Sequence, residues 1–153
     1  MRDKRHLVLY AVAGLVLVCG VFFCYLSYRA TTAVQTVTHT TQGMSFEVVK
    51  TPEAMERGLG GRPSIEENYG MLFIFGAPGT YGFWMKDMLA PIDIIWLSDN
   101  GTIVGIEENV SPDSYPKVFY PSSPVRLVLE TKAGESTRKN WKIGGQISLP
   151  SGI

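Results

Sequence analysis

A run of twenty uncharged residues near the N-terminus, from Leu7 to Leu26, is the strongest constraint on how this chain folds. At about 1.5 Å per helical residue, twenty residues reach about 30 Å, the thickness of a bilayer's hydrocarbon core. A cleaved signal peptide usually has an apolar stretch of only about 7–15 residues. The run therefore predicts a transmembrane helix, within residues 1–29, that stays attached to the protein as a signal anchor.

Basic residues around the run predict its orientation. Arg2, Lys4 and Arg5 precede it and only Arg29 follows it, so the positive-inside bias places the N-terminus in the cytoplasm. The chain is then expected to cross the cytoplasmic membrane once, with the bilayer as the partner of residues 7–26 and the remaining domain outside. Cleavage around residues 31–33 would instead release a secreted domain.

The charge and cysteine content of the remaining chain exclude several classes of protein. Beyond residue 29, ten basic and thirteen acidic residues remain, so the formal net charge is −3. No basic run is present, which argues against nucleic acid as a partner. Both cysteines, Cys19 and Cys24, lie in the apolar run. The outer domain therefore has no disulfide, no thiolate nucleophile and no cysteine metal site.

The rest of the chain divides into a linker and a β-rich domain. Residues 30–43 are rich in threonine and poor in large apolar residues, which predicts a linker whose end can continue into a first strand. From residue 44 to residue 153, short apolar runs alternate with turn residues, as β-strands do. A helix of at most two turns is expected within 51–61, because Thr51 is placed to cap it and Pro52 fits its first turn. The expected strands are 44–50, 70–75, 81–86, 92–97, 102–108, 125–130 and 144–150.

Two connections complete this fold prediction. Asn100-Gly101 tolerates positive φ and predicts a hairpin between 92–97 and 102–108. The stretch 111–124 contains four prolines, so it is expected to cross a surface as a loop. The chain thus predicts a mainly β (α+β) domain: a compact antiparallel β-rich barrel or sandwich with one short helix, preceded by the transmembrane helix.

The stretch "FWMKDMLAPIDIIWL", residues 83–97, contains the first candidate site residues. Ionised side chains in so apolar a run must be paired, hydrated or used for function. Asp93 has apolar neighbours, so we expect it to be buried, held by loop amides or by a cation such as Arg62 or Lys86. The functional alternative is a ligand-binding or general-base carboxylate at a pocket mouth. Lys86 and Asp87 are expected at an exposed edge.

Five further side chains complete the set of candidates, each with a structural alternative. Arg57 and Arg62 flank a glycine-rich loop, where they support the loop or clamp an anionic ligand. Trp84 and Tyr120 line a pocket for a flat ligand such as a sugar, or form the packed underside of a loop. Glu130 is expected to be a solvated strand end rather than a functional carboxylate.

The usual catalytic and metal-binding sets are missing from the outer domain. Its one histidine, His39, lies in the linker, and the sequence contains no histidine pair for zinc, no calcium-binding loop and no phosphate loop. We therefore expect no metal or cofactor and assign no catalytic residue. These features favour a non-catalytic cell-envelope module that binds a small ligand or a partner protein. The alternative is a carboxylate-dependent hydrolase or lyase acting on envelope saccharides, with Asp87, Asp93 and Glu130 as its acids.

Three sequence blocks also carry a resemblance to a known family. They are "ERGLGGRPSIEENYGMLFIF", "FWMKDMLAPIDIIWLSDNGTIVGI" and "YPSSPVRLVLETKAGES". Together they resemble the DUF192 family, also known as UPF0127, of small and often exported domains, over residues 44–149. The resemblance implies a β-rich, barrel-like fold with little helix, and it implies no chemistry. The chain departs from the family pattern at Gly60-Gly61, before Arg62, and at Asp87, where many members have asparagine.

Overall fold

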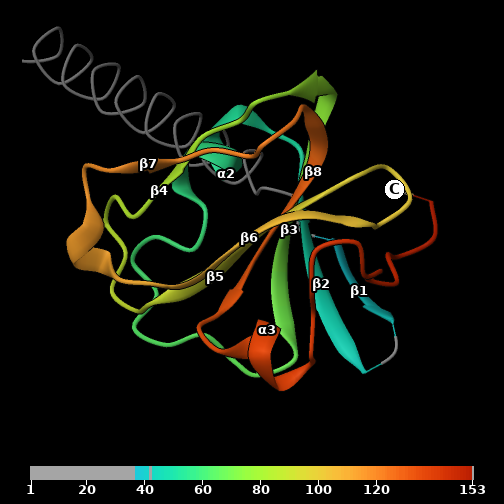
Figure 1. Ribbon diagram of the computed structural model, residues 1–153. Coiled ribbons are helices and arrows are strands. Elements are labelled where there is room, and N and C mark those ends of the chain that lie inside the picture. The colour runs from blue at the N-terminus through green and yellow to red at the C-terminus, as the bar shows by residue number, and fades with distance from the viewer. Residues whose placement is uncertain (1–36, 42, 153) are drawn as a thin grey trace, which may run out of the picture. The chain divides into compact units, whose positions relative to one another are not determined.

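The computed structural model describes residues 37–41 and 43–152 (Figure 1). The predicted transmembrane segment and the first part of the predicted linker lie outside them. In the described part of the chain, no helix is long and apolar enough to span a membrane. The strands are β1 (Val37–Thr41), β2 (Met44–Val49), β3 (Tyr69–Gly79), β4 (Phe83–Trp84), β5 (Ile92–Leu97), β6 (Ile103–Val110), β7 (Val118–Phe119) and β8 (Val125–Lys132). The helices are α2 (Pro52–Arg57), α3 (Glu135–Arg138) and the 3-10 turn η1 (Pro112–Ser114).

Six of the strands form one mixed sheet, in the order β1-β2-β3-β8-β5-β6, and β4 pairs with β7 in a separate ribbon. The expectation of an antiparallel sheet is wrong at one position, because β2 and β3 run parallel. Parallel neighbours need a crossover of about a dozen residues or more, usually containing a helix. Residues 50–68, which contain α2, provide that crossover.

The sheet is open within the described residues. Its edge strands, β1 and β6, do not pair with each other, so the barrel expected from the strand pattern and from the resemblance is not closed. The start of β6 contacts residues 144–147 instead, through a bridge between Thr102 and Gln146 and a hydrogen bond from Ile103 N to Gly145 O of 2.8 Å. The predicted strand 144–150 is wrong, because only this bridge forms there.

Both faces of the sheet are covered, which explains why β5 is apolar at every position except Asp93. On one face Phe73, Ile94 and Trp96 pack with side chains from α2 and from the β4–β7 ribbon. The opposite face packs Ile95 and Leu129 under the C-terminal segment. All six residues of β5 are buried between these two cores. The predicted strand 92–97 is confirmed at both of its ends.

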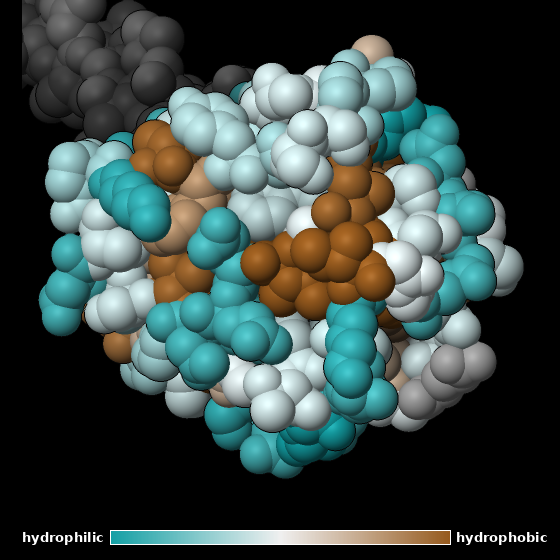
Figure 2. All heavy atoms as spheres, in the orientation of Figure 1, coloured by the Kyte–Doolittle hydropathy of each residue, from teal (hydrophilic) through white to brown (hydrophobic). Residues whose placement is uncertain are grey.

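Some local expectations changed with the tertiary pairing. Val37–Thr41, in the predicted linker, is strand β1, which pairs antiparallel with β2. Val118–Phe119, in the predicted proline-rich loop, pairs with β4. The predicted strand 81–86 shortens to β4, because a turn follows in which Asp87 has a φ of 58°. Figure 2 shows that residues of hydrophilic or intermediate hydropathy cover most of the viewed face, around a central apolar patch and smaller apolar areas to its left.

Candidate functional site

A cavity of about 220 Å³ is lined by residues of α2 and β4, on the face of the sheet that these elements cover. We call it the α2–β4 cavity. Its volume is several times the roughly 30 Å³ that one water molecule occupies in the liquid. It is therefore large enough for a small molecule. Its aromatic lining residues are Phe73, Phe75, Tyr81, Phe83 and Trp84. Its charged or titratable lining residues are Glu56, Arg57, Lys86 and Glu130.

The position of α2 follows from its terminal residues. The Thr51 hydroxyl accepts a hydrogen bond of 3.3 Å from Ala54 N, and Pro52 begins the helix, as the sequence predicts. Gly58 ends the helix with φ 52° and ψ −137°, a conformation that is essentially restricted to glycine. The chain then turns inward and buries Leu59 completely. The end of α2 is thereby held against β8.

Glu130 of β8 forms the inner end of the cavity. Its side chain is buried, and a Cβ atom added at Gly58 would lie 3.1 Å from its Oε2. This Oε2 atom has no hydrogen-bond partner among the described residues. The expectation of a solvated strand end is wrong, because β8 continues to Lys132 and the Glu130 side chain lies on the sheet face covered by α2.

Burial changes the acidity of this carboxyl group. It raises the pKa of Glu130 to about 7, although the Leu59 backbone amide and the charge of Arg62 act in the opposite direction. A carboxyl group with this pKa is about half ionised at neutral pH. It can therefore donate a hydrogen bond when protonated and accept one, or pair with a cation, when ionised.

Aromatic rings form the walls of the cavity. Phe75 and Tyr81 stack with their ring centroids 3.5 Å apart, and Phe73 meets Phe83 edge to face at 4.9 Å. These contacts fix the wall rings in place. Trp84 is 42% exposed, so part of its ring is accessible to a ligand at the rim of the cavity.

Two cations complete the rim, and both were predicted as candidates. Arg57 and Lys86 are exposed, and neither forms an ion pair with any described residue. Together with Asp87 they also line an adjacent hollow of about 410 Å³. The exposure predicted for Lys86 and Asp87 is confirmed. Asp87 O accepts a hydrogen bond of 2.8 Å from Gly61 N, which joins the loops that follow β4 and α2.

Arg62 is engaged elsewhere. Its guanidinium lies 2.8 Å from Glu47 Oε2 and donates a hydrogen bond of 2.7 Å to the Tyr69 hydroxyl. The Tyr69 hydroxyl in turn donates to Glu47. Burial and this bond to Glu47 raise the pKa of Tyr69 well above its usual range. Arg62 therefore joins β2 to the start of β3, and it is not the cation that holds Asp93.

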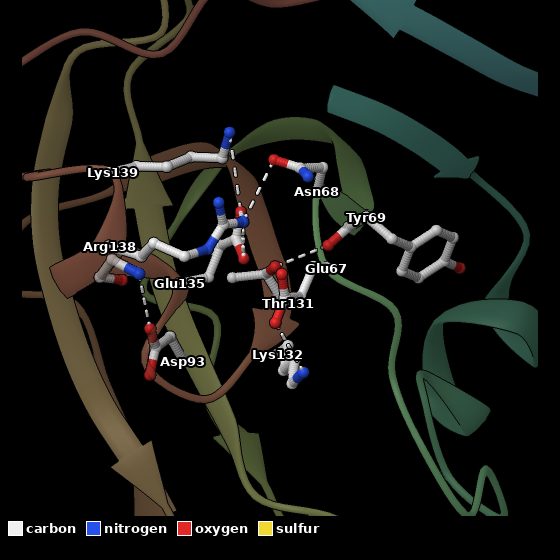
Figure 3. A network of polar contacts seen from close by, with 10 residues as sticks. Glu67, Asn68, Tyr69, Asp93, Thr131, Lys132, Glu135, Arg138 and Lys139 are labelled. Carbon is white, nitrogen blue, oxygen red and sulfur yellow. Dashed lines mark hydrogen bonds and ion pairs between the residues drawn. The ribbon is translucent and has the colours of Figure 1, made fainter. Parts of the chain in front are cut away.

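Asp93 is fully buried, as predicted, and backbone amides hold it. Its Oδ1 accepts bonds from Asn109 N at 2.8 Å and Gly134 N at 3.1 Å, and its Oδ2 accepts one from Ser136 N at 2.8 Å. Figure 3 shows Asp93 near the Glu135–Arg138 ion pair of α3, whose closest atoms are about 2.5 Å apart. The amide alternative is confirmed. Asp93 fastens α3 and the end of β6 to β5, and it does not line the α2–β4 cavity.

The structure thus brings together four of the predicted candidates and separates the others. Arg57, Trp84, Lys86 and Glu130 line one cavity. Tyr120 is 62% exposed and packs beside Gly82, outside that lining. The three acids considered for catalysis are apart: Glu130 lines the α2–β4 cavity, Asp87 lines only the adjacent hollow, and Asp93 lines neither. Among the described residues, no three metal-ligating side chains are grouped to hold a metal ion.

Sequence reasoning missed the wall residues. Phe73 and Phe75 lie two positions apart in one strand, so they share a sheet face, and this spacing was a usable signal. Tyr81 and Glu56 carried no comparable signal. Tyr81 is placed by its stacking on Phe75, and Glu56 reaches the cavity from exposed helix α2.

Comparisons with known proteins agree with this fold. The model of the DUF192 family, described as "Uncharacterized ACR", matches residues 33–149. A crystal structure from Sinorhizobium meliloti 1021, described as a candidate transcription regulator, is 32% identical, with a TM-score of 0.68. The match covers 72% of this chain and 84% of that chain. No curated protein matches this chain.

A second solved structure supports the fold alone. It is a protein of unknown function from Novosphingobium aromaticivorans DSM 12444, which is 23% identical, with a TM-score of 0.65. The match covers 78% of this chain and 96% of that chain. The architecture described above therefore recurs in a second chain at low sequence identity.

Proposed function

The chain belongs to the DUF192 family, and we propose that its domain binds a small ligand in the α2–β4 cavity. One observation carries this proposal: the buried carboxyl of Glu130 lines an aromatic cavity, and its Oε2 atom has no hydrogen-bond partner among the described residues. Leaving a buried polar atom unpaired costs about 1–3 kcal/mol. A ligand that bonds to this oxygen removes that cost, and this gain favours binding in the cavity.

Binding is favoured over catalysis by the arrangement of the acids. A glycoside hydrolase generally needs two carboxyl groups facing one pocket, about 5–9.5 Å apart. Of the acids that line the α2–β4 cavity, Glu130 is buried and Glu56 is an exposed side chain of α2. The acids that the sequence suggested as partners, Asp87 and Asp93, do not line it. The envelope hydrolase or lyase therefore remains the second candidate function.

The proposal includes a place in the cell. We place the domain outside the cytoplasm, anchored through the apolar run Leu7–Leu26, as a module of the cell envelope. The run lies outside the described residues, so the support comes from the sequence alone. It consists of the length of the run and the three basic residues that precede it. A non-catalytic module of this kind captures its ligand, or presents it to an envelope protein.

Ligand screening with two matched variants tests the binding proposal. The full chain in mild detergent is screened by thermal shift against sugars, short peptides, organic anions and amines. We expect at least one class to raise the melting temperature. Trp84→Ala should weaken that shift, because Trp84 lines the cavity, whereas Tyr120→Ala removes an exposed aromatic ring outside its lining. The proposal would be overturned if both substitutions weakened binding equally. It would also be overturned if no class of compound raised the melting temperature.

A further inference from the structure

The α2–β4 cavity has opposite electrostatic preferences at its two ends. Its inner end holds the buried carboxyl of Glu130, and its rim holds the exposed cations Arg57 and Lys86. We propose that its ligand is a small zwitterion, with an ammonium group bonded to Glu130 and an anionic group facing Arg57 and Lys86. This inference rests on the proposed function and names the chemical class that the same site takes.

The inner end favours a cation for two independent reasons. Glu130 is buried, and one of its oxygens has no partner among the described residues, so an ammonium N–H would supply the missing donor. The rings of Phe73, Tyr81 and Phe83 line the same space, and the face of an aromatic ring attracts a cation within about 6 Å. A neutral hydroxyl would satisfy the oxygen but would gain nothing from the rings.

The rim favours an anion. The described residues provide no carboxylate partner for Arg57 or Lys86, unlike Arg62, which is paired with Glu47. Arg57 also ends α2, and Lys86 lies in the turn after β4, so the two cations approach the opening from different elements. A carboxylate or phosphate at the outer end of the ligand would meet both. Of the exposed charged residues that line the cavity, two are cations and one, Glu56, is an acid; Glu53 and Asp87 line only the adjacent hollow.

Binding at this site should depend on pH through Glu130. The charge of Arg62, from the loop after α2, acts on it; the titratable or charged groups that line the same cavity are Arg57 and Glu56 from α2, Tyr81 from the segment before β4, and Lys86 from the turn after β4. The neighbouring strands present apolar side chains. With a pKa of about 7, the ionised fraction of Glu130 falls from about 0.9 at pH 8 to about 0.1 at pH 6. The affinity for an ammonium ligand should therefore fall about tenfold over that range.

Three matched compounds separate the contributions of the two charges. Phenylalanine carries both groups, phenethylamine lacks the carboxylate, and 3-phenylpropionate lacks the ammonium. Their charges do not change between pH 6 and pH 8. Titration calorimetry of the full chain in detergent should rank phenylalanine first and 3-phenylpropionate last at pH 8, with the tenfold pH effect confined to the two amines.

Variants then assign each charge to its side chain. Glu130→Gln keeps the shape of the side chain and should abolish the pH effect and weaken both amines at least tenfold at pH 8. Glu56→Gln, which removes an exposed acid from the same rim, should keep the pH effect. The double variant Arg57→Gln/Lys86→Gln should weaken phenylalanine severalfold and phenethylamine little or not at all.

The outcomes distinguish this inference from the function on which it rests. Equal binding of phenylalanine and 3-phenylpropionate to the wild-type chain would overturn the ammonium contact while leaving a ligand-binding cavity. Binding of none of the three, with Trp84-dependent binding of another class in the screen, would overturn the zwitterion alone. Absence of any Trp84-dependent binding would overturn both. Because the pH effect is measured on the wild-type chain, a variant that fails to fold does not remove the test.

Discussion

Asp93 and Glu130 are buried acids on neighbouring strands. Their surroundings differ in how far hydrogen bonds replace the water that each carboxyl group loses on burial. Asp93 accepts three backbone hydrogen bonds, which replace the water that it loses. Glu130 has a buried oxygen with no hydrogen-bond partner in the described part of the chain, and burial raises the pKa of its carboxyl to about 7. The first acid therefore contributes to holding the fold together, and the second is available to a ligand.

Glu130 should make the stability of the domain fall as pH rises. Its pKa is raised from 4.5 to about 7, so between these values the folded state binds the proton more tightly than the unfolded state. The free energy of unfolding should therefore fall by on the order of 3 kcal/mol from pH 4.5 to pH 7 and then level off. Urea unfolding of Glu130→Gln across this range should show that this decline is lost.

The control for this measurement is Glu66→Gln, which neutralises an exposed acid. It should retain the wild-type slope of stability against pH. If Glu130→Gln keeps that slope as well, the Glu130 carboxyl is not buried in solution.

Asp93 should be far more important to stability than Asp87. Asp93→Ala leaves three backbone N–H groups near the ends of β6 and α3 without their acceptor. Each unsatisfied group costs about 1–3 kcal/mol, so a total on the order of 3–5 kcal/mol is expected after partial rehydration. Asp87→Ala, at an exposed turn, should cost less than about 1 kcal/mol. Urea unfolding of both variants measures the two losses, and equal small losses would contradict the burial of Asp93.

At the scale of elements, helix α2 and the turn after it decide where the cavity lies. Thr51 and Pro52 define the start of the helix, and Gly58 directs the chain into the core at Leu59. This turn and the β8 strand meet at Glu130, although they are far apart in the sequence. The shape of the inner end therefore depends on a single backbone conformation.

Gly58→Ala should test that dependence. A Cβ atom at Gly58 would occupy a φ of +52° and lie 3.1 Å from Glu130 Oε2, so strain and crowding act together. Gly61→Ala is the matched variant: its φ is +76°, but no atom lies within 4 Å of the added Cβ. We expect Gly61→Ala to cost about 1–2 kcal/mol, the usual strain of a positive φ, and Gly58→Ala to cost more.

The two glycine variants are compared by thermal and urea unfolding. Only Gly58→Ala should also reduce ligand-induced stabilisation, because it alone changes the inner end of the cavity. An equal loss of stability in both variants would show that the contact with Glu130 has no energetic consequence.

For the whole molecule, the main prediction concerns topology. Alkaline phosphatase folds into an active enzyme only where its disulfides form, outside the cytoplasm. Fused after Ile153, it should be active, whereas the same fusion lacking residues 1–29 should be inactive. Activity confined to a reporter that works only in the cytoplasm would refute the orientation. The size of the fused chain on a gel distinguishes an anchor from a cleaved signal.

Local features of the fold were predictable because they depend on neighbouring residues. The run 92–97, apolar except for Asp93, is strand β5, and Asn100-Gly101 lies at the connection of the β5–β6 hairpin. Thr51 and Pro52 start α2 as expected. A cap, a turn with positive φ and a strand buried on both faces each leave a signature within a few residues. The membership of the family was also readable, from blocks of consecutive residues.

Only the tertiary structure decided what depends on residues far apart in the sequence. Two pairings join separate segments: the parallel pairing of β2 with β3 and the ion pair of Arg62 with Glu47. Whether the sheet closes likewise depends on how β1 and β6, which are far apart in the sequence, are placed. The state of Glu130 is the clearest example. Its strand was predicted, but its burial and its raised pKa depend on a turn about seventy residues earlier that covers it, and burial outweighs the opposing charge of Arg62. Burial and charge compensation are properties of a three-dimensional neighbourhood, so a pattern along one strand could not determine them.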